Sequence, residues 1–283
     1  MIGYKITYHT ENSYSQTVKE AIFDFLVLPA DDDRQRRLSH KISSTLKEPV
    51  FMYKNLYGFD VLRIRTSKAF DHFEFTVHST VHIKKEEERD MRPLSIKEEV
   101  DILTSDSFRI DNFLFLRKTR YTLVSPKNKK KFIRYDGKKH VFDFLLELNS
   151  HIYNLIEYCT LSTDVHTIAD QVFEMEKGVC QDYSHAFIAV ARENGIPARY
   201  VSGYLNQGVG FIGDTLMHAW VEALVPGVGW VGFDPTNNQL AGENHIKVAH
   251  GEDYSDCAPI KGVLKTTGTV ETKYSVQVIQ EQQ

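Results

Sequence analysis

The chain has 283 residues, and its 34 Lys and Arg residues against 38 Asp and Glu residues give a formal net charge of -4. This balance argues against a nucleic-acid-binding protein, which needs a concentrated basic face. No segment approaches the roughly 18 apolar residues of a membrane span, and the first ten residues lack the apolar core of a signal peptide. We therefore expect a cytoplasmic protein that binds neither nucleic acid nor membranes, with one large or two modest domains.

Residues 1–88 are predicted to form a β-rich domain. Polar and apolar residues alternate with period two over residues 4–9 and 73–83. The pattern breaks at residues 55–58 and resumes at Phe59, which indicates a hairpin. The charged run at residues 31–37 is interpreted as a solvated loop. Composition changes abruptly from Lys84 to Pro93, so we place the domain boundary there and assign residues 89–283 to a second domain.

The second domain is predicted to be α+β. Apolar spacing indicates helices over residues 142–157 and 167–176, the latter ended by Gly178. A third helix begins near Cys180 and is ended by Gly195 and Pro197. Alternation then predicts strands, and these cover residues 199–204, 218–225, 230–234 and 274–278. We expect the helix that starts at Cys180 to pack against an antiparallel sheet.

Cys180 is the candidate nucleophile. A helix N-terminus presents unpaired N–H groups and the positive end of the helix dipole, both of which favour a thiolate. A buried structural cysteine is the alternative, and it is the interpretation that we keep for Cys159 and Cys257, since neither begins a predicted helix. The three cysteines have no paired spacing, so neither a disulfide framework nor a zinc site is expected.

His218 and Asp234 lie at the same end of a predicted hairpin whose turn includes Pro226 and Gly227. If the loop has an odd number of residues, both side chains point to one face as diagonal neighbours, whereas an even loop separates them. A nucleophile, a base and a group that orients the base are the requirements of thiol acyl transfer. Cys180, His218 and Asp234 can fill these three roles.

The same residues carry a resemblance to the bacterial transglutaminase-like superfamily, whose members are related to papain-type cysteine peptidases. The matching segments are residues 178–185, 195–204, 218–222 and 233–237. By position, the resemblance implies that Cys180 is the nucleophile, His218 the base and Asp234 the orienting acid, on a papain-like core. The first 85 residues are similar to the β-rich domain that often precedes this core in bacteria. Residues 251–256 resemble a downstream family motif that has Arg at the position of Glu252.

Further site residues are proposed around this trio. The Cys180 backbone N–H is one candidate oxyanion donor, and Gln181 is a candidate for the second. Trp220, Gly210 and Tyr204 are candidate substrate contacts. Gly210 belongs to a G-x-G-x-x-G run at residues 208–213, but the next segment alternates as a strand where a dinucleotide site needs a helix. We interpret this run as a lid over the cleft.

The expected function is cysteine-dependent acyl transfer on peptide or glutamine-type carboxamides through a thioester. Hydrolysis is favoured, because water needs no second binding site and the sequence has no EF-hand pattern. Crosslinking of glutamine to amines is one alternative, and a catalytically silent binding module on the same fold is another. No cofactor and no metal are expected, because the histidines form no H-E-x-x-H motif. A peptide or protein substrate is the expected partner. His185, five residues after Cys180, is interpreted as a packing residue.

Overall fold

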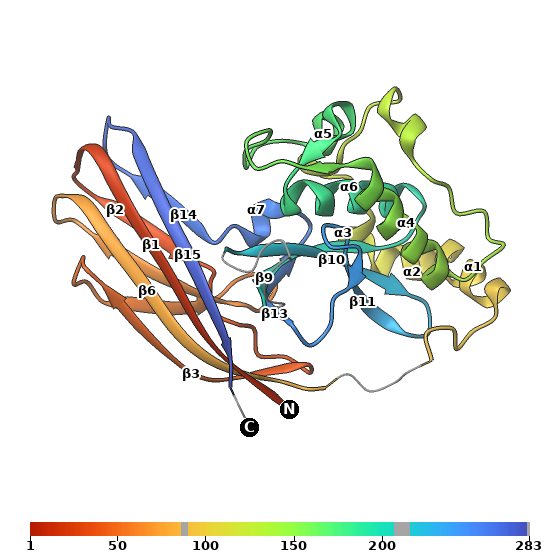
Figure 1. Ribbon diagram of the computed structural model, residues 1–283, viewed down its shortest axis with the longest axis horizontal. Helices are drawn as coiled ribbons and strands as arrows, with labels where there is room; N and C mark the ends of the chain where they lie inside the picture. The colour runs from red at the N-terminus through yellow and green to blue at the C-terminus, as the bar shows by residue number, and fades with distance from the viewer. Residues whose placement is uncertain (86–89, 207–215, 282–283) are drawn as a thin grey trace.

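The computed structural model describes residues 1–85, 90–206 and 216–281, which form an antiparallel β unit beside a unit of helices packed on a sheet (Figure 1). The α+β class predicted from the sequence is confirmed. Within the described residues, none of the helices combines the length and the apolar character that a membrane span needs.

Within the described residues, the β unit consists of two four-stranded antiparallel sheets, with strand orders β15-β1-β6-β3 and β14-β2-β5-β4. Its strands are β1 (Ile2–Val18), β2 (Ala21–Phe25), β3 (Gln35–Ser44), β4 (Val50–Lys54), β5 (Asp60–Thr66), β6 (Phe70–Ile83), β14 (Ile260–Leu264) and β15 (Val270–Gln280). Alternation places every second residue of β6 inside, where Phe75 stacks on Phe25 at 3.8 Å between ring centroids. The predicted hairpin joins β4 to β5, and Gly58 takes the positive φ of 84° that its turn requires.

The last two strands return to the first unit. β15 pairs with β1 from Tyr4↔Gln280 to Tyr14↔Val270, and β14 pairs with β2. In Figure 1 the start of β1 and the end of β15 lie together at the base of this unit. The division at residue 88 assigns β14 and β15 to the second domain, whereas their hydrogen-bond ladders join them to the sheets of the first.

The second unit has one five-stranded antiparallel sheet in the described part of the chain, in the order β12-β11-β10-β9-β13. Its strands are β9 (Ala198–Leu205), β10 (His218–Val225), β11 (Gly229–Asp234), β12 (Gln239–Leu240) and β13 (His245–Gly251), and β7 (Glu157–Tyr158) pairs separately with β8 (Lys177–Gly178). Its helices are α1 (Ile96–Thr104), α2 (Asp106–Asp111), α3 (Phe113–Leu116), η1 (Arg120–Thr122), η2 (Asn128–Lys131), α4 (Val141–Leu155), α5 (Ala169–Met175), α6 (Cys180–Glu193) and α7 (Tyr254–Cys257).

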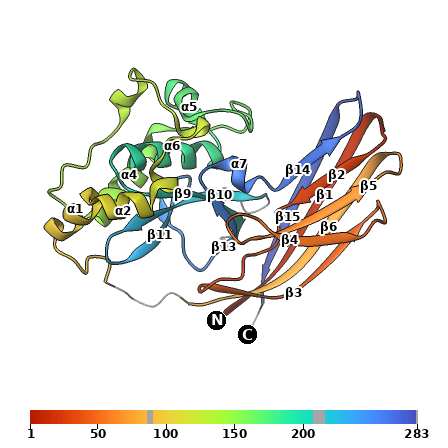
Figure 2. The ribbon, with the colours of Figure 1, turned by 180° about the vertical axis from the view of Figure 1, so that it is seen from behind.

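Helix α6 is the centre of this unit. Figure 2 shows it on the sheet, with helices α4 and α5 next to it, and all its residues from Gln181 to Arg192 are buried. Gly195, with φ 74°, follows its end as predicted. The end of α5 differs from the prediction, because Glu176 already takes a left-handed conformation with φ 53°. Lys177 and Gly178 are thereby released to pair with β7.

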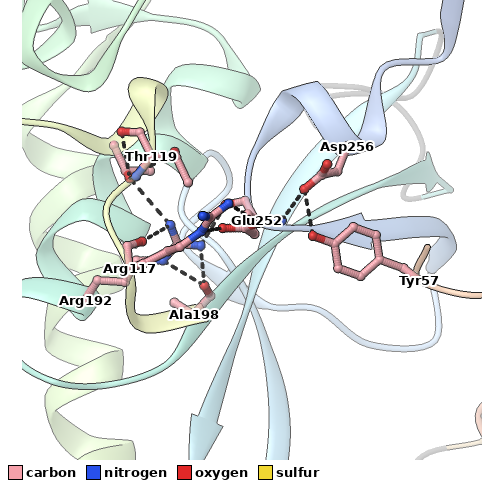
Figure 3. Close-up of polar contacts among 8 residues, drawn as sticks. Tyr57, Arg117, Thr119, Arg192, Ala198, Glu252 and Asp256 are labelled. Carbon is pink, nitrogen blue, oxygen red and sulfur yellow. Dashed lines mark hydrogen bonds and ion pairs between the residues drawn. The ribbon is translucent and has the colours of Figure 1, made fainter. Parts of the chain in front are cut away.

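The C-terminal part of α6 is anchored by the buried guanidinium of Arg192 (Figure 3). It donates hydrogen bonds to the carbonyl oxygens of Ala198 (2.8 and 3.1 Å), Glu252 (2.7 Å) and Arg117 (2.9 Å). The Glu252 side chain in turn accepts from Arg117, with 2.6 Å between Nη2 and Oε1. The acidic residue at the position where the family motif has Arg is therefore paired with a cation from another segment.

Several hydrogen bonds tie the units together, among them those of Tyr57 and Gln35. Tyr57, in the β4–β5 turn, donates from its hydroxyl to Asp256 (3.0 Å), as Figure 3 shows. Gln35 is buried, donates to the Lys247 carbonyl (2.8 Å) and accepts from the Lys247 N–H (2.9 Å). The interpretation of residues 31–37 as a solvated loop is therefore wrong for its second half, because residues 35–37 begin β3 and Arg37 forms an ion pair with Asp60.

Candidate active site

Cys180 is the first residue of α6, and its thiol is partly exposed. The turn before it is closed by Asp182, whose Oδ2 accepts from the Val179 N–H at 2.8 Å. Gly178 is needed here, because a Cβ at this position would lie 2.6 Å from the Cβ of Asp182. Asp182 and Tyr183 donate their N–H groups to the Val179 carbonyl oxygen (2.8 and 3.1 Å), so the N–H groups of Cys180 and Gln181, the first two of the helix, are the ones available to an anion beside the thiol.

His218 and Asp234 are brought together by the β10–β11 hairpin. Val225 pairs with Gly229, so three residues form the turn, and this odd number places both side chains on one face. His218 Nε2 lies 2.8 Å from Asp234 Oδ2, and both residues are buried. Because Nε2 is bound to Asp234, Nδ1 is the ring nitrogen left for proton exchange, and it makes no hydrogen bond with the described residues.

The His218–Asp234 pair is ionic. Burial alone lowers the pKa of His218, but the charge and hydrogen bond of Asp234, together with interaction with the Cys180 side chain, raise it to about 10. Burial raises the pKa of Asp234, and His218 and His245 outweigh that effect and hold it well below the ordinary value of 3.8. At neutral pH the site therefore holds an imidazolium beside Cys180.

The Asp234 carboxylate is fixed from several sides. Oδ1 accepts from the backbone N–H groups of Thr236 (3.1 Å) and Asn237 (3.3 Å). Oδ2 accepts from Asn237 Nδ2 (2.9 Å) and from His245 Nε2 (3.1 Å) in addition to His218. Sequence reasoning missed His245. It begins β13, whose neighbour is β9, and no spacing motif links it to Asp234.

His218, Asp234 and His245 are also residue types that bind transition metals, and their ligand atoms lie within 4.8 Å of one another. The Gly242 N–H donates to His245 Nδ1 at 3.2 Å, so the proton of this neutral ring is on Nε2. Nε2 then donates to Asp234 and has no lone pair for a cation. The three residues therefore form a hydrogen-bonded set, and the absence of a metal stays a prediction.

Trp220 packs behind the pair. Its ring lies 6.1 Å from that of His218 and 5.2 Å from that of His245, and it occupies the space over Gly203, where a Cβ would lie 2.5 Å from it. Trp220 and His245 both line a cavity of about 410 Å³ between the two units, whereas Cys180 does not. Trp220 thus packs against both imidazoles, and its contact with substrate stays a prediction.

The other predicted site residues lie apart from the thiol or are engaged elsewhere. Gln181 donates its side-chain amide to the Val165 carbonyl at 3.3 Å. Tyr204 is fully buried, and its hydroxyl donates to the Val27 carbonyl, which places it in packing between the units. Gly210, with the rest of the predicted lid, lies outside the described residues.

His185 has the packing environment expected of it. It is fully buried, stacks on Tyr121 at 4.8 Å and accepts from the Tyr254 N–H at 3.2 Å. Burial lowers its pKa to about 3, which keeps the ring neutral. Among the cysteines, Cys257 is fully buried, and burial raises the pKa of its thiol well above the ordinary value.

Comparison with known proteins gives matches to both units. Residues 4–82 match the bacterial transglutaminase-like N-terminal region, and residues 132–235 match the transglutaminase-like superfamily. An uncharacterized Mycobacterium leprae protein is 27% identical over 291 residues, which cover 97% of each chain. A stretch of 81 residues is 37% identical to a protein-glutamine gamma-glutamyltransferase of Pseudomonas aeruginosa, covering 26% of this chain and 12% of that one.

The fold is shared with a solved structure. A Cytophaga hutchinsonii protein provisionally named a cysteine protease superposes with a TM-score of 0.78 and 23% identity, covering 100% of this chain and 91% of that one. The N-terminal β unit, the core that begins its central helix with Cys180, and the two family matches lead to one assignment. The chain belongs to the transglutaminase-like superfamily and carries a bacterial transglutaminase-like N-terminal region.

Proposed function

We propose that this protein is a cysteine-dependent acyl-transfer enzyme that hydrolyses peptide or glutamine-type carboxamide bonds. Cys180 Sγ attacks the carboxamide carbon, and backbone N–H groups of the first turn of α6 stabilise the oxyanion. His218 donates its Nδ1 proton to the leaving amine, which leaves a thioester on Cys180. Water then attacks the thioester, with His218 Nδ1 accepting its proton, and the acid leaves.

The observation that carries this proposal is the buried His218–Asp234 contact of 2.8 Å beside a cysteine at a helix N-terminus. A histidine with a purely structural role needs no ionised partner that is buried away from water. A histidine that exchanges protons with a thiol needs such a partner, which orients the ring and stabilises its charged form. The raised pKa of His218 includes interaction with the Cys180 side chain, which supports an electrostatic link between nucleophile and base.

Thiol labelling tests the nucleophile. Iodoacetamide at about pH 6 reacts slowly with an ordinary thiol, whose pKa is about 8.5. We expect labelling of Cys180 by peptide mass mapping, and loss of that labelling in His218→Ala. Cys159→Ala is the matched control, because Cys159 is the other cysteine that is not buried. Equal labelling of Cys159 and Cys180 in the wild type would contradict the proposal.

The acyl acceptor is tested on a glutamine-containing protein, casein, with and without a fluorescent primary amine. Hydrolysis predicts ammonia release that does not depend on the amine, or new peptide termini, and loss of both in Cys180→Ala. Crosslinking is the second candidate, favoured by the segment that is 37% identical to a gamma-glutamyltransferase. It predicts incorporation of the amine into casein. Wild type with neither activity, and a Cys180→Ala variant that still binds a partner, would favour a binding module.

A further inference from the structure

Two imidazoles share one oxygen of Asp234. His218 Nε2 lies 2.8 Å and His245 Nε2 lies 3.1 Å from Oδ2. The two histidines come from β10 and β13, and their ring centroids are 6.1 Å apart. Because His245 is only 6% exposed and its ring also contacts Trp220, its orientation toward the carboxylate is set by packing as well as by the hydrogen bond.

His245 is held as a neutral donor. The Gly242 N–H occupies Nδ1 at 3.2 Å, so Nε2 carries the proton that goes to Asp234. Burial lowers the pKa of His245, the positive charges of His218 and Arg34 act in the same direction, and Asp234 only partly opposes them. One carboxylate thus receives one charged and one uncharged imidazole donor.

We propose that His245 is a positioning residue of the acyl-transfer site, whose neutral Nε2–H holds Asp234 Oδ2 and competes with His218 for it. This inference rests on the function proposed above. Hydrolysis of a thioester requires His218 to be neutral, because its Nδ1 must accept the proton of the attacking water. A carboxylate stabilised by a second donor attracts the His218 proton less strongly. His245 therefore assists the deacylation step, in which no thiolate is present.

The surroundings leave few other groups to set this balance. The titratable and charged groups that face the two rings are Asp234, Cys180 and Arg34. Further along the same sheet face, Lys247 is paired with Glu222 at 2.6 and 2.9 Å, so these two charges largely cancel. Hydrogen bonds to a charged group are worth about twice a neutral one, which makes the His245 donor a substantial competitor.

The test uses p-nitrophenyl acetate, whose acetyl group a reactive thiol accepts with release of coloured p-nitrophenolate. The burst reports acylation of Cys180, and the steady state reports deacylation. His245→Phe keeps a ring against Trp220 but removes the donor, and His245→Gln restores an N–H near the position of Nε2. We expect His245→Phe to keep the burst and to raise the pH of half-maximal turnover by about one unit, a roughly tenfold loss on the acid side. His245→Gln should return the midpoint toward that of the wild type.

The outcomes separate this inference from the proposed function. A wild-type burst that is absent, or that persists in Cys180→Ala, overturns the proposed function. A normal burst with an unchanged midpoint in His245→Phe overturns the role of His245 and leaves the proposed function standing. Equal losses of turnover in His245→Phe and His245→Gln, with the pH midpoint unchanged, also overturn the role of His245, because they indicate that the residue contributes packing alone. If His245→Phe does not fold by circular dichroism, His245→Leu takes its place, since it also lacks the donor.

Discussion

Replacement of Asp234 by Asn tests the electrostatics of the site most directly. The carboxylate accepts from donors on both oxygens: two backbone N–H groups on Oδ1, and His218, His245 and the Asn237 amide on Oδ2. An amide has only one accepting atom, so either orientation of Asn places its NH₂ group against at least two donors. The variant keeps the shape of Asp234 but loses both its charge and part of its hydrogen bonding.

The loss of stability is calculated for the orientation of the Asn side chain that leaves fewer donors without an acceptor. With its oxygen toward the imidazoles, the Asn amide leaves the Thr236 and Asn237 N–H groups without an acceptor. Each unsatisfied donor costs about 1–3 kcal/mol, so we expect Asp234→Asn to lower the free energy of unfolding by about 2–6 kcal/mol at high pH.

A second contribution to the difference in free energy of unfolding between wild type and Asp234→Asn depends on pH. The pKa of His218 is about 10 in the folded protein and 6.5 ordinarily, so its protonation stabilises the fold fully below pH 6.5. That stabilisation is lost as the pH rises from 6.5 to 10. Without the Asp234 charge, burial dominates and the pKa of His218 falls below its ordinary value. The difference between wild type and Asp234→Asn should therefore shrink with rising pH, by at most about 1.4 kcal/mol per pH unit.

Urea unfolding at pH 6.5, 8 and 9.5 measures this difference under reducing conditions. Asp111→Asn, an exposed substitution of the same charge type, controls for the change in net charge. We expect Asp111→Asn to follow the wild type at every pH. A gap between wild type and Asp234→Asn that stays constant from pH 6.5 to 9.5 would refute the ionic pair, even if the variant were much less stable.

Two further substitutions test the helix that carries Cys180. Glu252→Gln removes the charge that pairs with Arg117 and should lower the free energy of unfolding by about 1–3 kcal/mol in urea titrations. Labelling of Cys180 should not change. An unaltered free energy of unfolding would contradict a structural role for the Arg117–Glu252 pair. Burial raises the pKa of Asp182 to about 6, so its charge destabilises the fold as the pH rises from 3.8 through 6. Asp182→Asn keeps an acceptor for the Val179 N–H and removes the buried charge. The helix dipole offsets part of the cost of burying that charge. We therefore expect Asp182→Asn to stabilise the protein by about 1–2 kcal/mol at pH 7.5 and by little at pH 4, as measured by urea unfolding.

Local patterns were sufficient to predict the parts of the site that lie close in sequence. Strict alternation over residues 218–225 gave the bounds of β10, and the same-face relation of His218 and Asp234 required only that the turn be odd. The start of α6 at Cys180 followed from apolar spacing after Gly178. These features depend on backbone periodicity and on one turn, which neighbouring residues determine.

Long-range pairing was not accessible in this way. β15 is exposed along most of its length and alternates weakly, so nothing in residues 270–280 identifies β1, whose paired residues lie 256 to 276 positions earlier, as its partner. The short helices α1 and α2 were also missed. α2 has only six residues and buries none of them, so it has no apolar stripe. α1 carried a local signal that was overlooked, because Ser95 and Glu98 form a capping box and Ile96, Val100 and Leu103 have helical spacing.

His245 shows why the last part of the site depends on the sheet as a whole. β9 and β10 separate β13 from β11, and three strand spacings of about 4.8 Å would keep the two backbones roughly 14 Å apart in a flat sheet. The 3.1 Å contact therefore requires the two side chains to reach toward each other across the same face of a twisted sheet. Gly203 in β9 permits this, because a Cβ there would lie 2.2 Å from the Ile246 carbonyl oxygen and 2.5 Å from the ring of Trp220, on which both imidazoles pack. The contact between His245 and Asp234 thus requires a glycine on a third strand, and no spacing between the two residues could reveal it.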